Sequence, residues 1–238
     1  MVHQSLEFAR QGLPAVTGPA DLLTSHRCLL LDFDGPICSV FSGITSREAV
    51  DYLGKQLDTP LPSAISETTD PFDVLGFAEK LGPSTAARIE RAFARVEREA
   101  MAVSHPTPGA AELIRRASHR GYTVAVVSNN SASAIAAYLD DRDLHRDISG
   151  IFARTSADLT ALKPSAYLLN LAMRTLSTTA EHTVFVGDST TDIQAARAAR
   201  VSSIAFANRP EKIDRLAAHG PDAVITRLAD LTDALSTE

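Results

Sequence analysis

Short apolar runs alternate with longer helical patterns along most of this chain of 238 residues. Each run has the length of a buried strand and is bounded by polar or turn-forming residues. Strands that alternate with helices are typical of a parallel sheet with helices wound over both faces. The sequence therefore predicts an α/β fold built on a doubly wound parallel sheet. We expect strands over residues 28–33, 122–127, 183–186, 203–206 and 223–225, and helices over 109–119, 132–139, 165–176, 192–199, 211–218 and 228–235.

One connection is far longer than the others. Between the first expected strand and the second lie 87 residues, Gly35 to Gly121, although a crossover between parallel strands needs only about a dozen residues. When residues 107–121 are set aside for the crossover helix, roughly 70 residues remain, which is too many for a structureless loop in a compact domain. The sequence therefore predicts a core formed by residues 1–35 and 107–238, with a helical unit at 36–106 inserted into it.

Helical spacing predicts three helices in the inserted unit, over residues 46–57, 71–81 and 84–103. In the last of these, apolar residues recur along one face, and Ser84 is expected to cap the start of the helix. The opposite face carries charges of both signs, among them Glu90 and Glu97. We expect this charged face to be solvated, with neighbouring opposite charges supporting the helix.

The composition argues against several classes of function. The chain has 29 Asp and Glu against 23 Lys and Arg, a net charge of −6, whereas a nucleic-acid binder needs a basic face. No apolar run approaches the ~18 residues of a membrane span. The first 26 residues lack the pattern of a secretory signal, and two cysteines, Cys28 and Cys38, are too few for a disulfide scaffold. We expect a cytoplasmic protein with a small-molecule partner and no nucleic-acid or membrane partner, while the sequence leaves its oligomeric state, monomer or dimer, open.

Two aspartates follow the first expected strand directly. In an open α/β sheet, ligands bind beyond the carboxyl ends of the strands. Asp32 and Asp34 lie at such an end, and side chains two residues apart on an extended backbone point to one face. Two like charges at the end of a buried strand are costly unless a cation or a shared proton compensates them. A second Asp-x-Asp pair, Asp141 and Asp143, falls in a polar helix end, where we expect it to be solvated.

Polar residues also follow the second and third strands. Ser128 and Asn129 come after the second, where a hydroxyl and free N–H groups could hold an anion, although capping of the next helix explains the asparagines equally well. Asp188 comes after the third, and Asp192 falls in the first turn of the helix that follows. For Asp192, a favourable interaction with the helix dipole is the alternative.

Lysine is scarce in this chain, with four lysines against 19 arginines. One of the four, Lys163, precedes the helix that is expected to start near Ser165. Pro164 suits a helix start, but that does not explain the lysine. Lys163 is therefore a candidate for a charged role at the same edge of the sheet.

In combination and in this order, the four motifs resemble those of the haloacid dehalogenase-like (HAD) hydrolase superfamily, in its Asp-x-Asp phosphatase branch. The resemblance extends from about residue 28 to the end of the chain. It implies a Rossmann-like HAD core, and an insertion directly after the first motif is what that family calls a C1-type cap, here an α-helical cap domain. The connection from Lys163 to Thr183 has room for one helix and none for the alternative cap site.

The resemblance also implies roles in catalysis. Asp32 would be the nucleophile that forms an aspartyl phosphate, and Asp34 would protonate the leaving oxygen and later activate water. Ser128, Asn129 and Lys163 would bind the phosphate of the substrate. The implied reaction is hydrolysis of a small soluble phosphomonoester, of the sugar phosphate, phosphoglycolate or nucleotide type.

The cofactor implied by the resemblance is Mg²⁺. Its ligands would be the carboxylates of Asp32 and Asp188 and the backbone carbonyl of Asp34, with Asp192 nearby and water completing the shell. All-oxygen ligation with retained water is what Mg²⁺ prefers. The metal and Lys163 would offset the repulsion between the carboxylates and a phosphate dianion.

One residue departs from the family pattern, and three alternatives remain. Pro36 stands where these phosphatases usually carry Thr or Val, so the turn after Asp34 is expected to be stiffer and to lack a donor.

A phosphomutase of the β-phosphoglucomutase type shares every motif, and Arg47 could then bind substrate, although a solvated helix position explains Arg47 better. A receiver domain would be about half this length. A catalytically silent interaction protein would have no physical reason to keep charges that repel.

Overall fold

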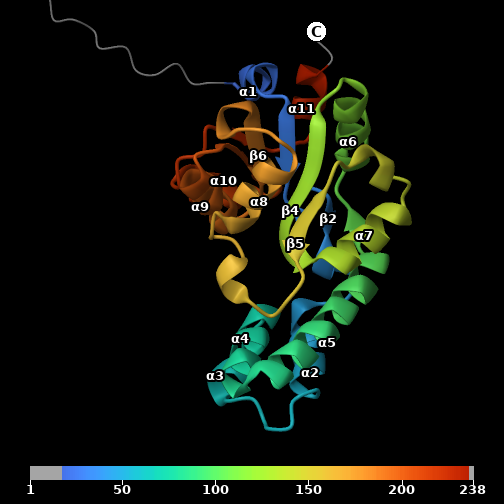
Figure 1. Cartoon of the computed structure of the whole chain (residues 1–238), viewed down its shortest axis with the longest axis vertical. Helices are drawn as coiled ribbons and strands as arrows, with labels where there is room; N and C mark the ends of the chain where they lie inside the picture. The colour runs from blue at the N-terminus through green and yellow to red at the C-terminus, as the bar shows by residue number, and fades with distance from the viewer. Residues whose placement is uncertain (1–17, 236–238) are drawn as a thin grey trace, which may run out of the picture.

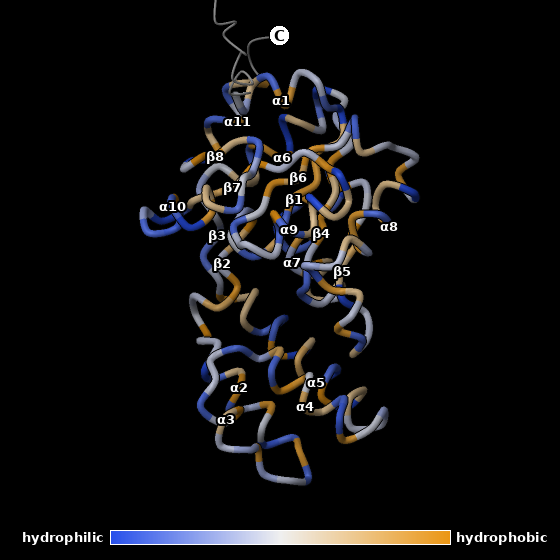
Figure 2. The backbone as a smooth tube through the Cα atoms, turned by 90° about the vertical axis from the view of Figure 1, so that its left-hand side faces the viewer, coloured by the Kyte–Doolittle hydropathy of each residue, from blue (hydrophilic) through white to orange (hydrophobic). Residues whose placement is uncertain are grey.

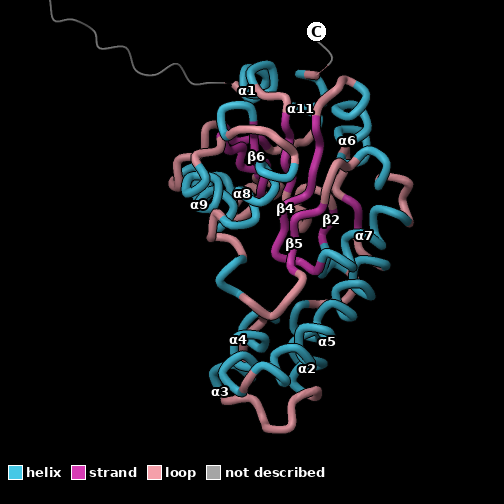
Figure 3. The backbone as a smooth tube through the Cα atoms, viewed as in Figure 1, coloured by secondary structure: helices cyan, strands magenta, loops and turns pink. Residues whose placement is uncertain are grey.

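The computed structural model describes residues 18–235 and confirms the predicted α/β fold. Six strands form one parallel sheet in the order β5-β4-β1-β6-β7-β8, and helices flank it (Figures 1 and 3). The sheet strands are β1 (Cys28–Leu31), β4 (Thr123–Ser131), β5 (Ile151–Arg154), β6 (Thr183–Gly187), β7 (Ser202–Phe206) and β8 (Ala223–Ile225). The helices outside the insertion are α1 (Pro19–Ser25), α6 (Ala110–His119), α7 (Ala132–Asp140), α8 (Tyr167–Thr175), α9 (Thr190–Ala199), α10 (Lys212–Ala217) and α11 (Ala229–Ala234).

Strand β1 is buried on both of its faces, which explains its uninterrupted apolar sequence. Leu29 and Leu31 pack in the hydrophobic cluster that includes α6 and α7. Leu30, which points the other way, packs in the cluster that includes α8 and α9. Because β1 lies between β4 and β6, the strand order reverses around it, and ligands of such sheets bind at that point.

Four α-helices lie between residues 40 and 104 of the chain and form a separate hydrophobic cluster. Its centre includes Val50, Val74 and Phe93, and these helices lie beyond the carboxyl ends of the sheet strands (Figures 1 and 2). We call them the inserted helices: α2 (Ser46–Gly54), α3 (Ser63–Ser66), α4 (Pro71–Leu81) and α5 (Pro83–Ala102). Two short antiparallel strands, β2 (Cys38–Ser39) and β3 (His105–Pro106), pair the connections that enter and leave the insertion.

The division of the chain at residues 36 and 106 stays a prediction, and residues 1–17 and 236–238 of the predicted core lie outside the described range. Within that range, Cys28 and Cys38 are both buried and free. No helix among residues 18–235 combines the length and the apolar character that crossing a bilayer requires.

Three expectations for the elements were wrong. The first concerns two elements that were not expected at all, strand β5, whose apolar run ends in Arg154, and helix α1. Helix α5 begins at Pro83 after Gly82, so Ser84 is not its N-cap. Glu97 does not lie on a solvated face: its side chain is fully buried against residues of β4 and β5.

Candidate active site

The ends of β1, β4 and β6 and the segment before α8 bring six of the seven predicted site residues to one cavity, all except Asp192. Asp32 follows β1, and its N–H donates to the carbonyl of Val186 in β6 (2.8 Å). Ser128 lies within β4, which runs past its expected end to Ser131 with an irregularity in its pairing with β5. The cavity, of about 490 Å³, lies between these strand ends and the inserted helices. Its lining includes Asp32, Asp34, Ser128, Asn129, Lys163 and Asp188.

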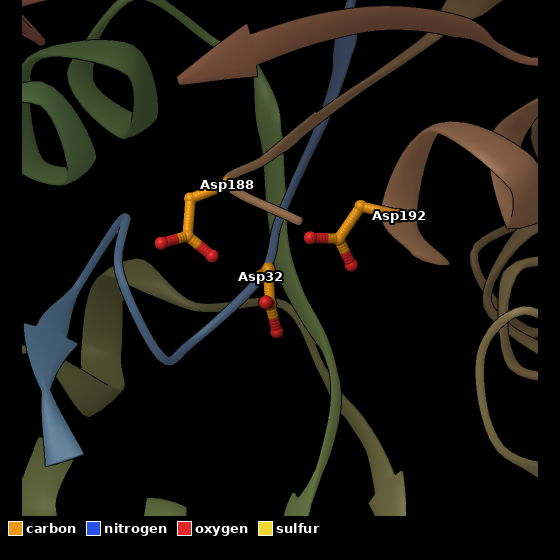
Figure 4. A group of neighbouring side chains, drawn as sticks. All are labelled: Asp32, Asp188 and Asp192. Carbon is orange, nitrogen blue, oxygen red and sulfur yellow. The ribbon is translucent and has the colours of Figure 1, made fainter. Parts of the chain in front are cut away.

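Three carboxylates converge on one point, as Figure 4 shows. One oxygen from each of Asp32, Asp188 and Asp192 lies within 4.8 Å of the others. Asp192 contributes from the first turn of α9, where its Oδ2 also accepts the N–H and hydroxyl of Ser189 (3.0 and 2.6 Å). Asp192 therefore lies in the first turn of α9, where an interaction with the helix dipole was the alternative, and also belongs to the carboxylate cluster.

Lys163 supplies a positive charge to two members of this cluster. Its Nζ lies 2.7 Å from Oδ1 of Asp32 and 2.6 Å from Oδ1 of Asp192. Burial opposes the charged form, but the two carboxylates outweigh it and raise the pKa of Lys163. The ammonium group is therefore held in its charged state next to Asp32.

Burial and crowding also change the acidity of the aspartates. Burial, followed by the charge of Asp192, raises the pKa of Asp32 to about 8, although Lys163 opposes the shift. Burial raises the pKa of Asp34 to about 6, against the N–H that Val40 donates to it. Burial also raises the pKa of Asp188. Burial is the largest cause of each shift, and a cation bound beside these carboxyl groups would favour their ionised forms.

The residues present fit a divalent cation with a preference for oxygen ligands. Oδ1 of Asp192 is buried, and the ammonium group of Lys163 lies 2.6 Å from it. Together with Asp32 and Asp188 it offers the hard oxygen donors that Mg²⁺ selects. The carboxylate of Asp34 lies apart from this set, where its Oδ1 accepts the N–H of Val40 (2.9 Å).

The turn after Asp34 needs a glycine. Gly35 has φ of +102°, and a Cβ built on it would lie 2.2 Å from Cγ of Asp188. Its N–H donates to the carbonyl of Cys38 (2.7 Å), and its carbonyl accepts the hydroxyl of Thr107 from the far end of the insertion. Pro36 therefore stands in a turn that the hydrogen bonds of Gly35 hold in place. The effect of Pro36 on the role of Asp34 stays a prediction.

Gly35→Ala is expected to lower turnover by about 10-fold or more, because the new methyl group would displace Asp188. Gly82→Ala is the matched control: Gly82 has a similar φ of +118°, but a Cβ added there would meet no atom within 4 Å. In both variants the free energy of unfolding should fall by about 1 kcal/mol, because alanine is strained at a positive φ. Urea unfolding and steady-state kinetics of both variants test this, and equal loss of turnover in the two would contradict it.

Asn129 and Lys163 hold each other in place. The amide of Asn129 donates to the carbonyl of Lys163 (3.0 Å) and accepts its N–H (2.8 Å). Ser128 is buried, and its hydroxyl donates to Oδ1 of Asn130 (3.2 Å). The side chain of Asn129 thus fixes the backbone of Lys163. Asn129 also lines the cavity together with Ser128 and Lys163, and its role towards phosphate stays a prediction.

Two sets of residues were missed from the sequence. Lys212, from the start of α10, contacts Oδ2 of Asp188, and Asn208 donates to the same oxygen (3.4 Å). Lys212 is one of only four lysines, a signal that could have marked it.

The second missed set links the inserted helices to the strand that carries Ser128. Glu97 of α5 accepts the side-chain amide of Asn130 and the N–H of Ser131, both at 2.9 Å, and pairs with Arg154 of β5. Arg154 also pairs with Glu90 (2.9 Å) and donates to the carbonyl of Asn129 (3.1 Å). Desolvation raises the pKa of Glu97 to about 7, although Arg154 and the donors oppose it.

Comparisons with known proteins find relatives in sequence and in fold. The phosphoglycolate phosphatase of Aliivibrio fischeri is 26% identical over 197 residues, which covers 81% of this chain and 82% of that one. The structure of CbbY from Rhodobacter sphaeroides in complex with phosphate has a TM-score of 0.67 at 22% identity, covering 89% of this chain and 99% of that one. The HAD-hydrolase YfnB from Bacillus subtilis, bound to magnesium, has a TM-score of 0.61 at 20% identity, covering 89% and 99%.

A family model described as haloacid dehalogenase-like hydrolase matches residues 30–206. This range runs from β1 to the end of β7 and includes the strand ends that carry the four motifs. The parallel sheet flanked by helices agrees with the fold expected from those motifs. The chain therefore belongs to the haloacid dehalogenase-like hydrolase family.

Proposed function

We propose that this protein is a Mg²⁺-dependent phosphatase that hydrolyses a small phosphomonoester through an aspartyl phosphate at Asp32. The observation that carries the proposal is the position of Lys163, whose Nζ joins Asp32 and Asp192 (2.7 and 2.6 Å) at the cavity that Ser128 and Asp34 also line. The phosphoglycolate phosphatases among the relatives and the phosphate in the CbbY structure support the same class of reaction.

In the first step, a carboxylate oxygen of Asp32 attacks the phosphorus of the substrate. A bond forms between that oxygen and phosphorus, and the bond from phosphorus to the alcohol oxygen breaks. Asp34, whose pKa is raised towards neutrality by burial, gives its proton to the departing oxygen. The product of this step is the free alcohol, with the phosphoryl group on Asp32.

In the second step, water attacks the phosphoryl group while Asp34 accepts a proton from that water. The bond from phosphorus to Asp32 breaks, inorganic phosphate leaves and both carboxyl groups return to their starting states. Ser128 and Lys163 would hold the phosphate oxygens during both steps, because their polar atoms line the cavity from β4 and from the segment before α8. Catalysis would rest on positioning and on charge stabilisation.

Asp32, Asp188 and Asp192 would hold Mg²⁺, with a contribution from the segment of Asp34. When bound, the ion would supply positive charge that lowers repulsion between the carboxylates and the phosphate dianion. The fixed cations nearby, Lys163 and Lys212, are fewer than the four aspartates of the site.

Mg²⁺ is expected to raise the thermal unfolding temperature of the protein relative to EDTA at the same ionic strength. A ligand that binds only the folded state adds about 2.7 kcal/mol at 100 times its Kd. Asp188→Asn should remove most of the shift, whereas Asn at the exposed Asp141 should keep it. Equal shifts in Asp188→Asn and the unmodified protein would show that the cluster does not bind the ion.

The activity itself is tested with p-nitrophenyl phosphate, sugar phosphates, nucleotides and phosphoglycolate in the presence of Mg²⁺. We expect release of inorganic phosphate that EDTA abolishes. Product analysis distinguishes the phosphomutase alternative, which would convert a sugar phosphate to its isomer without releasing phosphate. No turnover of any phosphomonoester would refute the proposal.

A further inference from the structure

The cavity has two sides of different chemistry. The sheet side carries the reacting groups described above. The side formed by the inserted helices and the segment before them is lined by Phe41, Ser46, Thr69, Asp70, Pro71 and Phe72. Among the described residues that line this second side, the charged one is Asp70. A substrate with its phosphate at Lys163 would place its alcohol portion towards this side.

The carboxylate of Asp70 is fixed at the start of α4. The backbone N–H of Asp70 donates to the hydroxyl of Thr68 (3.1 Å), and the side-chain Oδ1 of Asp70 accepts the backbone N–H of Phe72 (2.9 Å). The start of a helix generally attracts anions, but here a carboxylate of the chain itself caps it, and Pro71 has no N–H to offer. This end of α4 therefore presents negative charge to the cavity.

Arg47 supports this wall and does not oppose its charge. Its guanidinium donates to the carbonyls of Ser66 and Thr68 and pairs with Asp51. These bonds fix the segment immediately before Thr69 and Asp70. The arginine considered as a substrate ligand is thus engaged by the backbone of the inserted helices, and it is not among the residues that line the cavity.

Aromatic rings stand on the same side as Asp70. Phe72 packs edge-on against Phe93, with ring centroids 5.1 Å apart, so its ring is held in place. Phe41 lines the cavity as well. The guanidinium of Arg154 already lies 5.7 Å from the centroid of the Phe72 ring. The carboxylate of Asp70 is therefore the group that attracts an ammonium, while the rings accept the uncharged carbon skeleton of an alcohol. The same wall repels a second carboxylate.

We propose that Asp70 makes the enzyme prefer phosphomonoesters of alcohols that carry an ammonium group or no charge over phosphomonoesters of alcohols that carry a carboxylate. The inference rests on the proposed phosphatase function and names its substrate class. On this inference the preferred substrate differs from the phosphoglycolate named for the relatives, because the carboxylate of phosphoglycolate would face Asp70. Specificity arises here from repulsion as much as from attraction.

The test compares kcat/KM for phosphoethanolamine, glycerol phosphate and phosphoglycolate, with p-nitrophenyl phosphate establishing that the enzyme is active. For the unmodified protein we expect kcat/KM for phosphoethanolamine to exceed that for phosphoglycolate by about 10-fold or more, with glycerol phosphate between them. Asp70→Asn keeps a good helix cap. It should lower the ratio of kcat/KM for phosphoethanolamine to kcat/KM for phosphoglycolate about 10-fold, mainly through KM.

Glu67→Gln is the matched control, because it removes the same charge from an exposed residue three positions away that does not line the cavity. It should leave the ratio unchanged. A ratio that favours phosphoglycolate in the unmodified protein, or equal effects of the two variants, would overturn the inference while phosphatase activity stands. Failure to hydrolyse any of the four esters would overturn the proposed function and the inference with it.

Discussion

Asp32→Asn is expected to lower phosphomonoester turnover by about 10³-fold or more, because an amide cannot form the phosphorylated intermediate. The loss should appear in kcat. The variant should fold as well as the unmodified protein or better, since the substitution removes one charge from a cluster of repelling carboxylates. Steady-state kinetics with p-nitrophenyl phosphate and thermal unfolding of the same preparation measure the two effects separately.

The second Asp-x-Asp pair of the sequence offers the matched control. Asp141 is exposed at the end of α7, so Asp141→Asn makes the same chemical change at a solvated position. It should leave turnover within about two-fold and stability within about 0.5 kcal/mol. If Asp32→Asn behaved like Asp141→Asn, Asp32 would not be the nucleophile.

Glu97→Ala is expected to lower the free energy of unfolding by about 3 kcal/mol or more. It would remove one partner of a buried ion pair and leave Arg154 with Glu90 as its remaining carboxylate. It would also leave the amide of Asn130 and the N–H of Ser131 without their acceptor. Urea unfolding at neutral pH measures the loss.

Glu97 also holds the strand segment that follows Ser128, so Glu97→Ala should weaken binding of inorganic phosphate at a temperature where the variant is still folded. Glu99→Ala is the control, since Glu99 lies two residues further along α5 and is exposed. It should change stability by no more than about 0.5 kcal/mol. A loss below about 1 kcal/mol in Glu97→Ala would contradict the importance assigned to this network.

The strand ends could be predicted because their signals are local. Asp32 follows three leucines, and Asp188 follows a run of β-branched and aromatic residues, so the sequence itself places both at the edge of a sheet. Parallel strands end at the same edge, which is enough to expect these residues to meet. The structure does bring them to one cavity, while their catalytic roles stay proposals.

The position of Glu97 could not be predicted in the same way. It lies beside Val96 at the edge of the apolar face of α5, where a small rotation of the helix decides between solvent and interior. Its partner Arg154 is 57 residues away, in strand β5, which was not expected because its apolar run ends in that charged residue. The contact between Lys212 and Asp188 was missed because these residues are 24 positions apart and meet only through the way α10 packs.

The central claim is that Asp32 carries the phosphoryl group during turnover. Mixing the enzyme with substrate and Mg²⁺, quenching with acid within one turnover and mapping the phosphorylated peptide by mass spectrometry tests it most directly. We expect one phosphoryl group on Asp32, which forms before phosphate is released and is absent from Asp32→Asn. Phosphate release with no phosphoryl group on Asp32 at any time within the turnover, or a phosphoryl group on Asp34 instead, would contradict the proposed mechanism.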